Sequence, residues 1–100
     1  MSEKKKQEVK LEILLDEETA QGVYANLVVV NHTDAEFTLD FIFVQPQAPR
    51  AAVRSRVIAS PRHIKRLVKA LEQNLRHYEQ THGAVEVEET GAPPLEGNYH

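Results

Sequence analysis

The segment from Ser60 to Gly83 constrains the fold most, because it carries the start and stop signals of one long helix. Ser60 is a favourable N-cap, since its hydroxyl can accept a hydrogen bond from a backbone N–H of the first turn. Pro61 suits the first helical position, and Gly83 suits the position just past the end. Between them lies an apolar stripe on a 3.6-residue period: Ile64, Leu67, Val68, Leu71, Leu75 and Tyr78. We expect a helix of about 22 residues, roughly 33 Å long.

The chain before this helix has the patterns of β-strands. Apolar residues at every second position, Val9, Leu11, Ile13 and Leu15, alternate with Lys10, Glu12 and Leu14, which is typical of a half-buried strand. Three further strands are predicted at Val23–Asn31, Glu36–Val44 and Ala52–Ala59. Turn-forming residues separate the second and third strands, so these two should form a hairpin. One face of the third strand should line the core, because it carries Phe37, Leu39, Phe41 and Phe43.

These elements predict an α+β fold, a four-stranded antiparallel meander followed by one long C-terminal helix. A chain of 100 residues has room for one small domain, which we place at residues 8–83. Residues 1–7 are basic and residues 84–100 are acidic and rich in glycine and proline. Neither end has a pattern that could be packed, and both are predicted to be disordered.

A single helix can cover only one face of the predicted sheet. The other face is too apolar to remain in water, and exposed patches of this kind usually mark an interface. We therefore predict a homo-oligomer, most simply a symmetric dimer. The candidate interface residues are Tyr24, Val28, Val30, Ile42, Val44 and Ile58.

Charge is segregated along the chain, although the net charge is only −3. From Gln7 to Pro49 there are eight acidic residues and one lysine, and from Arg50 to Arg76 there are eight basic residues and one glutamate. The two blocks could neutralise each other if they lie side by side, and Arg54 and Arg56 would then approach Asp40 across two strands. The alternative is a polyanionic partner.

The basic residues crowd the first half of the helix, where the helix dipole disfavours cations. We call Arg62, Lys65, Arg66 and Lys69 the basic cluster. Together with Arg54, Arg56 and His63, it is the candidate surface for a partner or an anion. The acidic strands or a second copy, a protein partner, or nucleic-acid phosphate could each balance its charge. The acidic overall charge and the lack of exposed aromatic platforms argue against nucleic acid.

Several classes of function lack support in the sequence. Cysteine is absent, which removes disulfides and thiolate chemistry and favours a cytoplasmic protein. The five histidines have no metal-binding spacing, and neither a nucleophile motif nor a phosphate-binding glycine loop occurs. We therefore expect no enzyme, no cofactor and no metal. Because no apolar run reaches about 18 residues, we also expect no signal peptide and no membrane span.

Several short motifs resemble the DUF3467 family of small bacterial and archaeal proteins. They are Tyr24–Asn26, His32, Glu36–Phe41, Ser55–Val57 and the helix from Ser60 onward, in that order. The resemblance runs from about Val9 to Gly83. It implies a small stand-alone domain and supplies no catalytic residues, because the function of the family is unknown. The matching positions include Tyr24, Asn26, His32, Asp40, Arg56, His63 and Lys65.

The β-β-β-β-α order is also similar to that of a SecB export chaperone subunit, although this similarity is one of architecture alone. Our leading hypothesis is a non-catalytic, homo-oligomeric protein-interaction module. The alternatives are a nucleic-acid-binding protein that uses the basic start of the helix and a SecB-like holdase chaperone.

Overall fold

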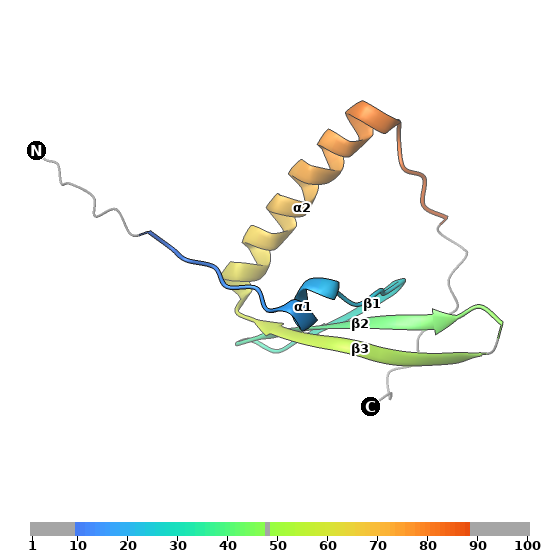
Figure 1. The fold of residues 1–100 in the computed structure, drawn as a ribbon, viewed down its shortest axis with the longest axis horizontal. Coiled ribbons are helices and arrows are strands. Elements are labelled where there is room, and N and C mark those ends of the chain that lie inside the picture. Colours follow the sequence, from blue (N-terminus) through green and yellow to red (C-terminus); the bar gives the residue numbers. More distant parts are fainter. Residues whose placement is uncertain (1–9, 48, 89–100) are drawn as a thin grey trace, which may run out of the picture. The chain divides into compact units, whose positions relative to one another are not determined.

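A computed structural model describes residues 10–47 and 49–88 of the chain. The element order is α1 (Glu17–Gln21), β1 (Leu27–His32), β2 (Phe37–Gln45), β3 (Arg50–Ala59) and α2 (Pro61–His82), as Figure 1 shows. The three strands form one antiparallel sheet in the order β1-β2-β3, so β2 is the central strand. The predicted α+β class, antiparallel sheet and long C-terminal helix are confirmed.

The predicted first strand is wrong. Residues 10–16 contain neither helix nor strand, and the described sheet has three strands instead of four. Leu11, Ile13 and Leu14 are each more than three-quarters exposed. Alternation sets the direction of side chains, but a strand also needs a neighbour for its backbone hydrogen bonds. Within the described residues this segment has no such neighbour.

The predicted second strand begins later than expected, at Leu27 instead of Val23. The residue before it, Asn26, pairs with β2 through its side chain as well as its backbone. Its Nδ2 donates to the Val44 carbonyl at 3.1 Å, its Oδ1 accepts from the Val44 N–H at 2.8 Å, and its backbone N–H donates to the Ile42 carbonyl at 2.9 Å. The Asn26 side chain therefore bonds to the β2 backbone at the start of β1, as a backbone group of a paired strand would.

The hairpin between β1 and β2 is confirmed. Thr33 closes its turn, because its hydroxyl accepts from the N–H groups of Ala35 and Glu36 at 3.1 and 3.2 Å. The Thr33 N–H also donates to the Glu36 carbonyl at 2.9 Å. This short connection joins the edge strand β1 to the central strand β2.

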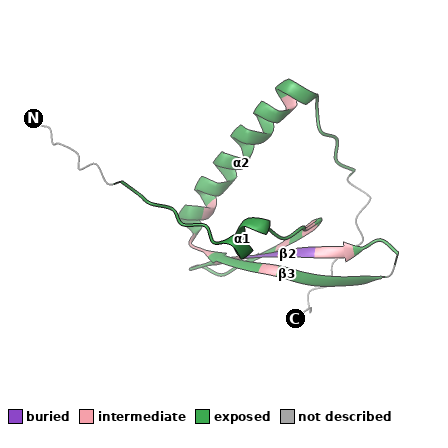
Figure 2. Cartoon of the chain, viewed as in Figure 1, coloured by how far each residue is buried: buried purple, intermediate pink, exposed green. Residues whose placement is uncertain are grey.

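Burial is concentrated in β2, as Figure 2 shows. Leu39 and Ile42 are the buried apolar residues of the described chain, and Asp40 is its buried charged residue. The three phenylalanines of β2 are only partly covered. The predicted core face contributes Leu39, whereas the opposite face of β2 contributes the buried Asp40 and Ile42, so buried side chains occur on both faces of β2.

Helix α2 begins and ends where its signals predicted. The Ser60 hydroxyl accepts from the His63 N–H at 3.4 Å, and Pro61 opens the helix. Gly83 has φ +97°, and its N–H donates to the Glu79 carbonyl at 2.9 Å. Despite this regularity, α2 contains no buried residue. The apolar stripe is therefore formed but not covered.

Two compact units are distinguished in the chain. One contains the segment that ends at Asn31 together with Thr38–Ile58, and the other contains His32–Phe37 together with the residues from Ala59 onward. The predicted disordered N-terminus at 1–7 lies outside the described residues, as does most of the predicted acidic tail. Among the helices that the structure describes, none combines the length and apolar character needed to cross a membrane.

Candidate functional site

The best-defined charged contact joins a residue of the acidic block on β2 to a residue of the basic block on β3. Arg56 Nε donates to Asp40 Oδ1 at 2.6 Å, and its Nη2 donates to Oδ2 at 2.9 Å. This bidentate pairing suits a planar guanidinium and a carboxylate. Asp40 is fully buried, whereas the Arg56 side chain is about half exposed at 54%. The predicted cross-strand pair is confirmed, and part of the basic block is neutralised within the chain.

Arg54 lies two residues earlier on β3 and has a different partner. Its guanidinium carbon is 5.5 Å from the centre of the Phe43 ring, within the range of a cation–π contact. Tyr24 meets the same ring edge to face, with centroids 6.0 Å apart. Arg54 is thus placed on an aromatic pair, although its predicted role in partner binding stays a prediction.

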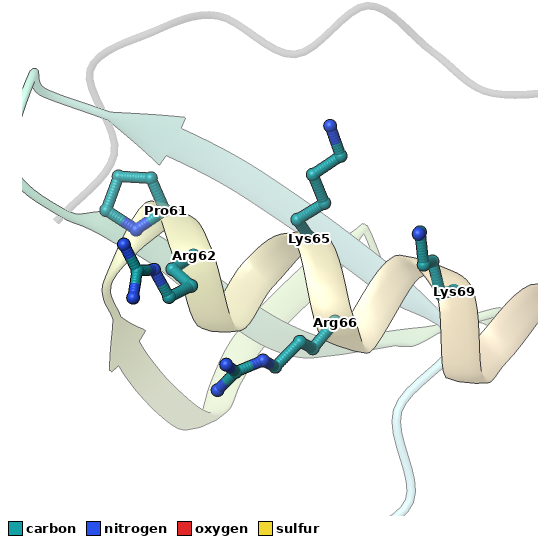
Figure 3. Close-up of a pocket in the computed structure, with 5 residues that line it drawn as sticks. All are labelled: Pro61, Arg62, Lys65, Arg66 and Lys69. Atoms are coloured by element: carbon teal, nitrogen blue, oxygen red, sulfur yellow. The ribbon is translucent and has the colours of Figure 1, made fainter.

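The basic cluster surrounds an open hollow at the start of α2. The hollow has a volume of about 440 Å³ and is lined by Pro61 and the four cluster residues (Figure 3). Lys65 and Lys69 extend from one side of the helix, and Arg66 extends from another. Among the residues that the structure describes, these four side chains form no ion pair. No direct ion pair within the described part of the chain therefore neutralises them.

His63 contributes to the helix start and not to the hollow. Its backbone N–H makes the capping bond to Ser60, and its ring Nδ1 lies 3.4 Å from Arg66 Nη1. No group of three or more potential metal ligands occurs among residues 10–47 and 49–88. The side chains of the basic cluster offer hydrogen-bond donors and positive charge at the hollow.

The candidate interface residues of the sheet separate into two groups. Tyr24, Val28, Val30 and Ile58 are exposed, with fractions from 41 to 72%. Val44 is partly covered and Ile42 is buried within this chain, at 5% exposure. Ile42 therefore contributes to the core, and only the exposed members present an apolar surface.

The apolar stripe of α2 is not among the surface residues predicted from the sequence. In the structure Leu71, Leu75 and Tyr78 are each at least half exposed. The residues beside the stripe were also omitted, including Glu72 and Glu79. The spacing of these acids, seven residues from each other, was the signal that could have identified them.

Most positions that carry the family resemblance have a structural contact. Asn26 extends the β1–β2 pairing, Asp40 and Arg56 form the half-buried ion pair, and His63 joins the cap of α2. The His32 ring stacks on Phe37, with centroids 5.1 Å apart. Lys65 differs from these, because it lines the hollow.

Comparison with known proteins agrees with these motifs. The model of DUF3467, a protein family of unknown function, matches residues 1–87 of the chain. Neither the curated proteins nor the solved structures contain a match. Because the family match covers most of the chain, this chain belongs to the DUF3467 family.

Proposed function

We propose that this protein is a non-catalytic, homo-oligomeric protein-interaction module. The observation that carries the proposal is the small amount of apolar burial. Among the described residues only Leu39 and Ile42 are buried apolar residues, whereas eighteen large apolar side chains are exposed. These occur in the segments before and after α1, on β1 and β3, along α2 and just after α2.

The magnitudes favour a second polypeptide. Burying an apolar side chain contributes about 1.5–3 kcal/mol, whereas ordering one residue of backbone costs about 1–2 kcal/mol. Among residues 10–47 and 49–88, two buried apolar residues cannot offset the ordering of the backbone that the structure describes. Other copies of the chain that cover the exposed residues would supply the missing burial.

The experiment is a molar mass measurement by light scattering on the full chain across micromolar concentrations. The proposal predicts a multiple of 11.3 kDa that falls on dilution, together with a melting temperature that rises with protein concentration. A mass of one chain at all concentrations, with a melting temperature independent of concentration, would overturn it.

A second candidate function is the binding of nucleic-acid phosphate by the basic cluster. The specific observation in its favour is the hollow, where four basic residues meet without an ion pair to the described residues. Phosphate contacts of this kind weaken steeply as salt rises. Gel mobility of labelled nucleic acid at low and moderate salt should therefore show salt-sensitive binding that is lost when all four residues become glutamine. Equal retention by the glutamine variant would remove this candidate.

A further inference from the structure

The apolar stripe of α2 has the spacing of a helix that packs lengthwise against another helix. Ile64, Val68, Leu71, Leu75 and Tyr78 alternate steps of four and three residues, which is the heptad spacing of coiled coils. Leu67 adds to one side of the stripe. α2 is regular over its 22 residues and buries none of them. The stripe therefore forms a continuous apolar seam along a straight helix.

The two sides of this seam differ in charge. One side, which we call the charged flank, carries Lys65, Glu72 and Glu79, each seven residues from the next and so nearly aligned. The other side carries Asn74 and Thr81. Their side chains donate to carbonyls of their own helix, at 2.9 Å to Ala70 and 3.3 Å to His77. Only the charged flank thus presents ionised groups beside the seam.

The charge order along this flank discriminates between two orientations of a helix pair. In an antiparallel pair the charged flanks of the two copies lie next to each other, because a two-fold axis relates them. Lys65 then lies opposite Glu79 of the second copy, and this pair occurs twice. In a parallel pair the charged flank lies against the neutral one, and the two basic clusters lie side by side and repel.

The antiparallel register that aligns Lys65 with Glu79 uses the seam from Val68 to Tyr78 and places Ile64 opposite His82, whose ring lies 4.6 Å from the Tyr78 ring of its own helix. Val68 faces Tyr78 of the second copy, and Leu71 faces Leu75. Glu72 falls beside its own equivalent at the two-fold axis, which is the unfavourable contact in this register. A shift by one heptad would pair Lys65 with Glu72 and would place Tyr78, the aromatic residue of the seam, opposite Pro61 and outside the helix contact.

We infer that the seam of α2 is covered by α2 of a second copy in antiparallel orientation, with Lys65 and Glu79 paired between the chains. This inference rests on the proposed homo-oligomeric function and names the surface that produces it. One oxygen of Glu79, Oε2, already accepts from the Val85 N–H at 2.9 Å. The other carboxylate oxygen of Glu79 can accept the Lys65 ammonium of the second copy.

Charge-swap variants of the full chain test the pairing. Lys65→Glu replaces two attractive contacts by two repulsive ones, so the dimer dissociation constant should rise about ten- to thirty-fold at low salt. Glu79→Lys should have a similar effect. The combination Lys65→Glu with Glu79→Lys should restore most of the affinity. The control is Arg76→Glu, which makes the same charge change outside the basic cluster and off the two flanks of the seam, and should leave the constant within about two-fold.

A further variant tests the contact at the two-fold axis separately from the Lys65–Glu79 pair. Glu72→Gln removes the repulsion at the two-fold axis, so it should lower the dissociation constant about two- to five-fold. Sedimentation equilibrium measures all constants, and circular dichroism verifies that each variant keeps its helix. An oligomer that shows no rescue by the double swap and no tightening by Glu72→Gln would overturn this inference alone. A wild-type chain that stays monomeric would overturn the proposed function as well.

Discussion

Strand β2 and helix α2 are both well-formed elements, yet they differ in what surrounds them. β2 has nine residues and contains the two buried apolar side chains and the buried Asp40. α2 has 22 residues, an intact cap at each end and no buried residue. The comparison separates two causes of structure. Local signals are sufficient to define a helix, whereas burial requires a neighbour, and the buried residues of the described chain lie in β2 and not in α2.

The largest expected effect concerns association through α2. Leu71→Glu places a charge in the seam of both copies and removes two leucines from it, so association should weaken by about 3–6 kcal/mol. The matched control is Gln73→Glu, which adds the same charge on the outer side of α2. A dilution series by light scattering should show monomers for Leu71→Glu at concentrations where Gln73→Glu remains associated. Identical behaviour of the two variants would contradict the account of the seam.

The next effect concerns the neighbours of β2. Asp40→Ala leaves the Arg56 guanidinium without its bidentate carboxylate, and the free energy of unfolding should fall by about 1–3 kcal/mol. The loss is not larger, because Arg56 is half exposed and water can solvate it. Asp34→Ala, in the exposed turn, is the control. Urea unfolding at one protein concentration should separate the two variants, and equal midpoints would show that the buried pair contributes little.

A smaller effect tests whether local signals define α2. Ser60→Ala removes the oxygen that accepts the His63 N–H, which should cost about 0.5–1 kcal/mol. Ser60→Gly should cost only a few tenths of a kcal/mol, because glycine is itself a tolerated N-cap. Urea unfolding followed at 222 nm measures both. A loss for glycine equal to that for alanine would argue against this cap.

The smallest effect concerns α1, the short helix before the sheet. A hydrogen bond from the Thr19 side chain, followed by one from its backbone N–H, lowers the pKa of the N-cap Asp16 below the ordinary 3.8. Its stabilisation of α1 is therefore present above pH 3.8 and is lost as the pH falls through the lowered pKa. The Thr19 amide signal in an NMR titration should have its midpoint below 3.8, and Thr19→Val should raise that midpoint. A midpoint above 3.8 in the wild type would contradict this contact.

The parts of the fold that depend on local chemistry were predictable from the sequence. The bounds of α2 follow from Ser60, Pro61 and Gly83, and the β1–β2 hairpin follows from its turn residues. The Asp40–Arg56 pair was predictable because adjacent strands place opposite charges across from each other. In each case the relevant residues are close in sequence or belong to neighbouring strands.

The parts that depend on neighbours were not predictable in the same way. The alternation from Val9 to Leu15 indicates a strand, but no pattern within a segment shows whether a partner strand exists. The late start of β1 depends on how Asn26 uses its side chain, which its residue type does not reveal. The apolar stripe of α2 has the same sequence pattern whether it faces a core or another copy.

The most direct test of the account measures distances between two copies along α2. Because the chain lacks cysteine, single cysteines that replace Arg66, Gln73 or Gln80 on the outer side of α2 can carry spin labels. In the antiparallel pair the two-fold axis passes near Gln73, so the distance between copies should be shortest there. At Arg66 and at Gln80 the two labels should be separated by about 21 Å more along the helix axis than at Gln73, and the separation should be the same at both positions. Equal distances at all three positions, or no distance between copies at any of them, would contradict the antiparallel pairing of α2.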